Sequence, residues 1–443
     1  MSAAAALMEP SFNMDKLSYE IFSILESKFL FDDPKFLVHA TADAAPPVAM
    51  PSPRDAPSSS AGRVRVLSVD ASGATDGLFA AASLARLECS LRKLSGEPSA
   101  RIADFFDVAA GSGVGGVLVA LLFTRGPAGR PLFSAAEAVE FLARNRRALQ
   151  PKGKKKSVFS AIFRRSGDTT DRLLRRVLGD ATLRDTVKPV LIPCYDLSTG
   201  APFLFSRADA VETDGYDFLL REVCAATVAS AKMRSVDGRT TIDAVDGGVA
   251  AGNPAAAAIT HVLNNRMEFP FVTGVDDLLL VSLGNGESTA ACGRQREARR
   301  ALMSPSRPDI VKIAGEGASD MVDQAVSMAF GPNRTSNYVR IQASVCDSGR
   351  FRTVDDAGQL LAKAEELLAQ KNVESVLFQG RRVSEKSNGE KLEWVSAELI
   401  REHEGRKKCP IPVVVFKQGS PRSSSCSALS SCSGSPMATA SPR

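Results

Sequence analysis

Short apolar runs alternate with segments that carry apolar residues at helical spacing through the middle of the chain. Residues 63–69 alternate between polar and apolar positions, which predicts a strand, and Leu84, Leu87 and Leu91 follow at the spacing of a helix. A second apolar run at 106–110 leads through a glycine-rich turn into another helix. Further strands are predicted at 189–195, 203–205, 241–245, 278–282 and 337–342. Strands that alternate with helices favour a mostly parallel sheet with helices on both faces, an α/β fold.

The two ends of the chain follow a different pattern. Residues 14–31 place Leu17, Ile21 and Phe29 on one helical face, which favours a helix docked on the main domain over a helix lying on a membrane. Residues 356–371 and 390–404 predict two further helices. The expected organisation is an N-terminal helical segment at 1–39, an Ala/Pro/Ser-rich linker at 40–62, a main domain at 63–345 with its motif core at 63–286, a C-terminal helical region at 346–416, and a disordered Ser-rich tail at 417–443.

The glycine-rich turn after residues 106–110 carries the most specific chemical signal. A buried strand, a tight turn and a buried helix together form a nucleophile elbow, in which one side chain sits exposed on a strained turn. In a G-x-S-x-G interpretation, Gly111 and Gly115 flank that side chain and position 113 should be serine. Position 113 is glycine. The sequence therefore predicts the framework for acyl transfer without its usual nucleophile.

The same glycines allow a second interpretation. Gly111, Gly113 and Gly116 also fit G-x-G-x-x-G, which binds a dinucleotide pyrophosphate at a helix N-terminus. That fingerprint needs an acidic residue about 20 positions further on, at the end of the next strand. Glu137 and Glu140 lie near that spacing, but their segment predicts a capped helix. A dinucleotide-binding protein is therefore the remote alternative.

Composition and charge narrow the class of protein. A hydrophobic fraction of 44%, 24% charged residues and a formal charge of +5 are ordinary for a globular protein and give no reason to expect nucleic acid. The eight cysteines show no metal-binding or paired spacing, which favours reduced thiols in the cytoplasm. No apolar run approaches the ~20 residues of a spanning helix, so any membrane contact is expected to be peripheral.

One basic run stands out between the predicted strands. Residues Lys152 to Arg165 hold six basic residues and no acid, with Phe159 and Phe163 among them. A solvated loop is the favoured interpretation. The interleaved aromatic residues allow a second one, a loop lying on anionic lipid, where each basic residue contributes about 1 kcal/mol.

Three glycine-containing motifs, considered together, resemble those of one known family. They are Asp70-Ala71-Ser72-Gly73 after the first strand, the turn Gly111-Ser112-Gly113-Val114-Gly115, and Asp246-Gly247-Gly248. Their order and spacing resemble the patatin-like phospholipases, and specifically the plant group III patatin-related acyl hydrolases, over roughly residues 63–345. The resemblance implies a patatin-type three-layer fold and a serine–aspartate dyad with no cofactor and no metal. It implies Asp246 as the proton acceptor and the loop at 70–73 as the oxyanion hole.

Two positions depart from the family pattern. Gly113 replaces the nucleophile, and Ala71 and Ser72 stand where the family has glycine. Loss of a catalytic serine costs roughly 10⁶ in rate in a serine protease. Three substitutes remain as hypotheses: Ser112, which is offset by one residue from the apex; Ser72, which lies in the facing loop; and a water activated by Asp246.

The histidines do not suggest a triad instead. The chain has three, His39, His261 and His403, and none lies in a typical catalytic motif; His261 belongs to a predicted Ala-rich helix. The resemblance implies non-specific hydrolysis of membrane glycerolipids, namely phospholipids, with galactolipids as a further class. The glycine at the nucleophile position predicts that this activity is weak. The chief alternative is a catalytically inactive patatin that binds acyl lipids.

Overall fold

The computed structural model describes residues 62–70, 73–126, 128–149, 168–288, 307–345, 354, 356–376 and 379–417. These residues belong to one compact unit. The predictions for the helix at 14–31, the basic run at 152–165 and the tail fall outside the described residues, as do Ala71 and Ser72. No helix in the described ranges combines the length and the apolar character that crossing a membrane would require.

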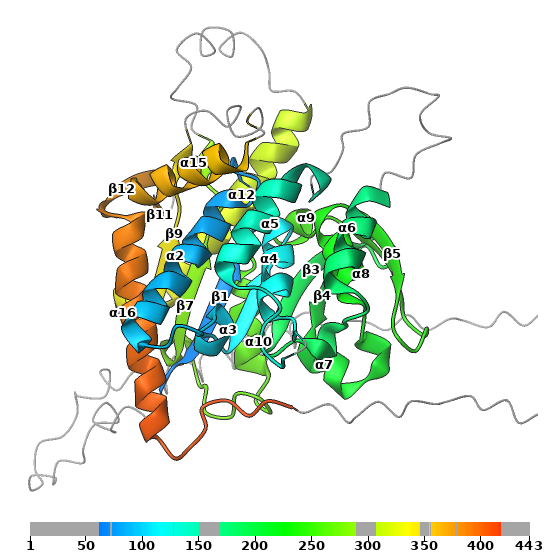
Figure 1. The fold of residues 1–443 in the computed structure, drawn as a ribbon, viewed down its shortest axis with the longest axis horizontal. Coiled ribbons are helices and arrows are strands. Elements are labelled where there is room, and N and C mark those ends of the chain that lie inside the picture. The colour runs from blue at the N-terminus through cyan, green and yellow to red at the C-terminus, as the bar shows by residue number, and fades with distance from the viewer. Residues whose placement is uncertain are drawn as a thin grey trace, which may run out of the picture. The chain divides into compact units, whose positions relative to one another are not determined.

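An eight-stranded sheet forms the centre of the fold, in the order β5-β6-β3-β2-β1-β7-β9, with β4 paired to β3 (Figure 1). The parallel strands are β1 (Val64–Val69), β2 (Val108–Gly111), β3 (Val190–Asp196), β7 (Leu278–Leu283) and β9 (Tyr338–Ile341). The antiparallel strands are β4 (Ala201–Ser206), β5 (Ser230–Arg234) and β6 (Thr241–Val245). The prediction of a mostly parallel α/β sheet is confirmed.

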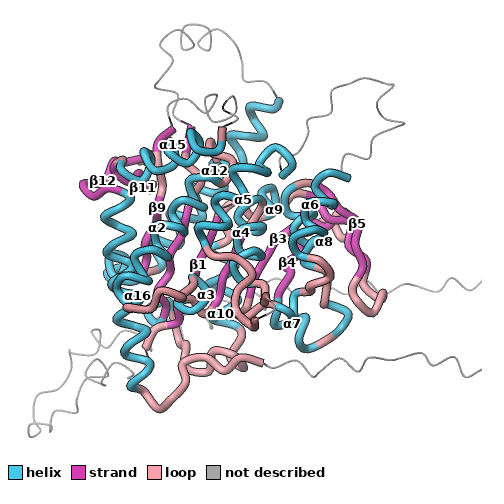
Figure 2. The backbone as a smooth tube through the Cα atoms, viewed as in Figure 1, coloured by secondary structure: helices cyan, strands magenta, loops and turns pink. Residues whose placement is uncertain are grey.

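Helices cover both faces because successive side chains of a strand point to opposite sides. On β1, Leu67 and Val69 pack into one apolar cluster, and Val64 and Val66 pack into another. The first cluster includes residues of α2 (Leu78–Ser95), α4 (Val114–Phe123), α5 (Ala135–Leu149) and α8 (Leu220–Val228). The second includes residues of α10 (Ala255–Asn264) and α12 (Arg307–Ala329). Figure 2 shows the strands between these helices.

Two helices from the C-terminal part of the chain pack on the first face. Helix α15 (Ala357–Ala369) and helix α16 (Asn388–Lys408) both contact α2. Between them lies a hairpin of β11 (Lys371–Val376) and β12 (Gly380–Ser387), which the sequence pattern did not predict. The remaining short elements are α3 (Ile102–Phe105), α6 (Asp168–Leu178), α7 (Arg207–Glu212), α9 (Gly247–Ala250), α13 (Arg334–Asn337), β8 (Glu287–Ser288) and β10 (Ser344–Val345).

Candidate functional site

The turn between β2 and α4 has the backbone of a strained elbow. Gly113 adopts φ 53° and ψ −129°, a conformation that residues with a Cβ seldom adopt. The flanking glycines allow the close approach of strand and helix. A Cβ on Gly111 would lie 2.4 Å from the carbonyl oxygen of Gly115, and a Cβ on Gly115 would lie 2.4 Å from the carbonyl oxygen of Val69. The helix N-terminus is therefore held against β1 and β2 by residues without side chains.

Asp246 caps the short helix α9 directly after β6. Its side chain accepts a hydrogen bond of 2.9 Å from the Gly248 N–H, and its own N–H donates to the Ala229 carbonyl at 2.7 Å. The residue is half-buried and has a positive φ of 21°, which is uncommon for a non-glycine residue. Burial raises the pKa of the carboxyl, and hydrogen bonds from the Gly248 and Val249 N–H groups partly oppose that rise.

Thr227 on α8 joins the two turns. Its fully buried hydroxyl accepts a 2.9 Å hydrogen bond from the Gly113 N–H and donates to the Pro193 carbonyl at 3.0 Å. A Cβ on Gly247 would lie 2.1 Å from the same hydroxyl oxygen, so this position has no space for a side chain. The glycine at position 113 and the residue after Asp246 therefore pack around one threonine.

Ser112 does not occupy the exposed position that a nucleophile needs. Its side chain is fully buried, and its Oγ donates to the Gly252 carbonyl at 3.4 Å. It therefore connects the elbow to the segment that follows Asp246 and is not presented to solvent. Ser72, the other substitute nucleophile considered, lies outside the described residues, as does Ala71.

Asp70 lies at the end of β1, where polar side chains bind both its carboxylate and its backbone carbonyl. Its carboxylate is buried and accepts a 2.5 Å hydrogen bond from Arg340, which also donates to Ser282 at 2.8 Å. Burial raises the pKa of Asp70, and the Arg340 charge partly offsets this effect. The Asn285 side chain donates to the Asp70 carbonyl at 2.6 Å, while a Cβ on Gly73 would lie 2.4 Å from the Asn285 carbonyl oxygen. These contacts hold both ends of the predicted oxyanion loop.

The two described histidines lie in other surroundings. His261 on α10 packs against Phe269, and burial lowers its pKa to about 4. His403 on α16 packs against Phe105 and lies 3.5 Å from Arg65, near the start of β1. Neither is bonded to Asp246 in the part of the chain that the structure describes.

The structure gives Glu137 a capping role. Its carboxylate accepts hydrogen bonds from the N–H and hydroxyl of Ser134, and the Ser134 hydroxyl accepts the Glu137 N–H in return. Within 114–126 and 128–149, α4 is followed by α5 with no intervening strand. The acidic residue that a dinucleotide site needs is therefore engaged at a helix start. Among the described residues no group of three or more His, Cys, Asp or Glu could hold a metal ion.

The fold and the site together define a class of α/β protein with a glycine-built elbow and an adjacent aspartate turn. A sequence profile described as patatin-like phospholipase matches residues 67–259. Patatin-like protein 3 of Oryza sativa subsp. indica is 51% identical over 416 residues, covering 90% of this chain and 93% of the relative. Patatin-like protein 6 of Arabidopsis thaliana is 46% identical, covering 95% and 90%. A third relative, probable inactive patatin-like protein 9 of Arabidopsis thaliana, is 43% identical, covering 76% and 86%. The chain belongs to the patatin-like phospholipase family.

Proposed function

We propose that this protein is a weak lipid acyl hydrolase in which Asp246 activates a water molecule in place of the missing serine. The observation that carries this proposal is the pairing of two turns on Thr227: one has a hydrogen atom at the nucleophile position, and the other presents a half-buried carboxylate. Because glycine has a hydrogen atom where serine has a hydroxymethyl group, a water molecule fits at about the position of the missing hydroxyl. A carboxyl whose pKa is raised by burial is a better base than an exposed one.

The proposed step is a direct hydrolysis. One water proton moves to a carboxylate oxygen of Asp246 while the water oxygen attacks the ester carbonyl carbon. The resulting oxyanion faces the first turn of α4, where the N–H of Val114 has no partner inside the helix. Collapse of this intermediate breaks the bond to the alkoxy group, which takes the proton back from Asp246. The products are a free fatty acid and an alcohol.

The substrates in this proposal are membrane glycerolipids, namely phospholipids and galactolipids. We further propose that the protein is cytoplasmic and contacts membranes peripherally, with the basic run at 152–165 lying on anionic lipid. The expected rate is low. Loss of a serine nucleophile costs roughly 10⁶, and about 10³–10⁴ over water remains from the oxyanion hole and binding in the enzymes where this has been measured.

Fatty acid release from phosphatidylcholine and galactolipid vesicles tests the proposal. The purified full-length chain is compared with Asp246→Asn, Ser112→Ala and Ser72→Ala. The isosteric Asn keeps the hydrogen bond from Gly248 but cannot take a proton, so release should fall to the uncatalysed level in that variant alone. Equal rates in wild type and Asp246→Asn would assign any activity to another site. Loss in Ser112→Ala or Ser72→Ala would replace the water mechanism with a serine one.

A second candidate function is an inactive patatin that binds acyl lipids. The glycine at 113 and the burial of Ser112 favour it, and one relative carries the name probable inactive patatin-like protein 9. Saturable binding of a fluorescent fatty acid, with no release of fatty acid from any vesicle, is the result expected for this function.

A further inference from the structure

A cavity of about 560 Å³ lies at the β9 edge of the sheet, separated from β6 and Asp246 by the strands β3, β2, β1 and β7. Its walls come from α12, α13 and β9 on one side and from the β11–β12 hairpin and α16 on the other. The volume falls in the range of about 300–1,000 Å³ that is typical of small-molecule sites. The motifs that define the elbow and the aspartate turn contribute no residue to it.

Hydrogen-bond donors dominate the walls of this cavity. They include five basic side chains and, in addition, hydroxyl groups. The basic residues are Arg334, Arg340, Arg382, Lys386 and Lys391, and the hydroxyl residues are Ser327, Thr335, Tyr338, Ser375 and Ser384. Three carboxylates, Asp323, Glu374 and Glu385, also line it.

Partners within the wall already occupy two of these carboxylates. Glu374 accepts from Lys391 at 2.6 Å and lies 3.4 Å from Arg382, so two cations share one anion. Asp323 accepts the Tyr338 hydroxyl and lies 3.9 Å from Arg340. Arg340, which also lines the cavity, is in turn paired with Asp70.

Two basic residues remain at the rim. Arg334 on α13 and Lys386 on β12 are both exposed, and no ion pair among the described residues joins either one to a carboxylate. They line the cavity from opposite walls, together with the hydroxyl residues Thr335 and Ser384. Cations and hydroxyl donors that converge from two sides suit a phosphate group, which offers several acceptor oxygens and a negative charge.

We propose that this cavity binds a phosphate-bearing ligand, with Arg334 and Lys386 as its charged contacts. Trp394 on α16 also lines the cavity and provides an apolar face for the rest of the ligand. The shared chemistry is a phosphate monoester. It can belong to a soluble metabolite or to the head group of a membrane lipid. The proposal is independent of hydrolysis at Asp246.

Trp394 makes the proposal directly measurable because it is the sole tryptophan of the chain. Its emission is followed while the full-length protein is titrated with glycerol 3-phosphate, with inorganic phosphate, and with vesicles of phosphatidic acid in phosphatidylcholine. Glycerol, and sodium chloride at matched ionic strength, serve as blanks. A saturable change with the soluble ester assigns a metabolite site, and a change with the vesicles alone assigns a lipid head group.

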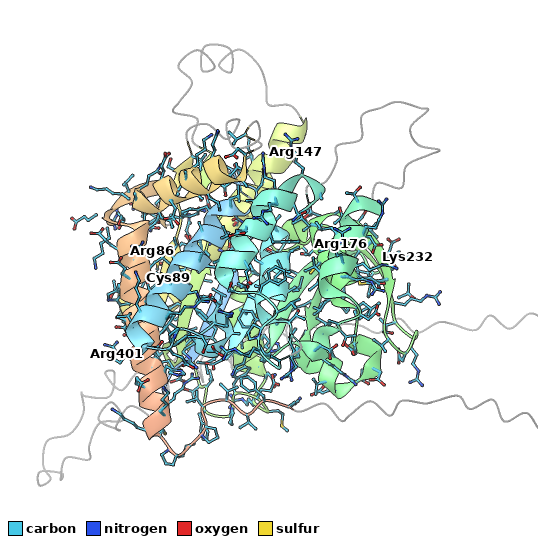
Figure 3. All side chains as sticks on the ribbon, in the orientation of Figure 1. Arg86, Cys89, Arg147, Arg176, Lys232 and Arg401 are labelled. Atoms are coloured by element: carbon cyan, nitrogen blue, oxygen red, sulfur yellow. The ribbon has the colours of Figure 1, made fainter. Side chains whose placement is uncertain are left out.

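The matched variants are the double change Arg334→Gln with Lys386→Gln, and Arg176→Gln on α6. In Figure 1, β12 and α16 lie at the left of the view and α6 at the right, and Figure 3 labels Arg176 there. Apparent affinity should fall about tenfold or more in the double variant and stay unchanged in Arg176→Gln. Equal affinity in all three proteins, or a response that sodium chloride reproduces, would overturn the proposal. If the double variant unfolds, Lys386→Gln alone on the exposed hairpin gives the same comparison.

Discussion

Gly113 combines the backbone of a nucleophile elbow with the smallest possible side chain. Its φ of 53° and ψ of −129° lie where a residue with a Cβ is strained by about 1–3 kcal/mol. The glycine at this position therefore carries neither a hydroxyl nor this strain. Functional elbows keep such strain because the exposed side chain is needed for chemistry.

A serine introduced at position 113 should lower stability and raise activity. We expect Gly113→Ser to lose about 1–3 kcal/mol of unfolding free energy and to hydrolyse p-nitrophenyl esters at least about 100-fold faster than wild type. Denaturant unfolding and p-nitrophenol release measure the two effects. A fluorophosphonate probe should label the variant at position 113, with Gly113→Ala as the control for strain. A folded variant without label would show that the elbow no longer faces a reactive cleft.

Asp246 should cost the folded state stability at neutral pH. Burial raises the pKa of the Asp246 carboxyl, so the folded state favours its protonated form. The resulting stabilisation is fully present below the ordinary pKa of an aspartate and is lost as the pH rises through the raised value. Asp246→Asn should therefore melt at a higher temperature than wild type at neutral pH, with the difference shrinking on acidification. Asp246→Ala also loses the cap on Gly248, about 1 kcal/mol, and should melt lower than the Asn variant. Thermal unfolding across pH measures both.

At the scale of elements, the elbow depends on a residue that no sequence motif contains. Thr227 lies in the apolar stretch of α8, and its hydroxyl bonds the Gly113 N–H and the Pro193 carbonyl. Thr227→Val keeps the shape but leaves both groups without this partner, so we expect a loss of about 1–3 kcal/mol. Thr227→Ser keeps the hydroxyl and should lose less. Thr260→Val, on the exposed face of α10, is the matched control. Urea unfolding of the three variants measures these losses. Equal losses in Thr227→Val and Thr227→Ser would contradict the bridging role of the hydroxyl.

Sequence patterns predicted the strands whose residues are nearly all buried. The runs at 189–195 and 278–282 are almost entirely apolar because β3 and β7 are buried on both faces, and both strands form there. Strands β5 and β12 carry mostly exposed residues, with charged side chains among them, so neither a strand pattern nor a helix stripe marked them. Glycine-built turns can likewise be found from sequence, because only glycine fits their close contacts. Thr227 could not be found in this way, because its role depends on two partners distant in the chain.

At the scale of the whole molecule, charged pairs join the C-terminal helix to the start of the sheet. Asp107 precedes β2 and is buried between two arginines, Arg65 of β1 at 3.2 Å and Arg406 of α16 at 2.7 Å. Burial alone would raise its pKa, but the two positive charges outweigh burial and hold the pKa well below its usual range. Arg406 thus bonds a buried carboxylate that lies 299 positions earlier in the sequence.

This arrangement predicts a stability difference that depends on pH. Arg406→Gln leaves Asp107 with Arg65 alone and should lower the free energy of unfolding by about 1–3 kcal/mol at neutral pH. Because the pKa of Asp107 is lower in the folded state, its carboxylate stabilises the fold above the unfolded pKa of about 3.9. This stabilisation is lost as the pH falls toward the folded pKa. The gap between wild type and Arg406→Gln should therefore narrow on acidification. Lys407→Gln, in an exposed pair with Glu404, should differ little from wild type at any pH. A gap that stays constant on acidification would show that Arg406 acts through packing of its aliphatic stem, so that the charge on Asp107 would not be what holds α16 in place.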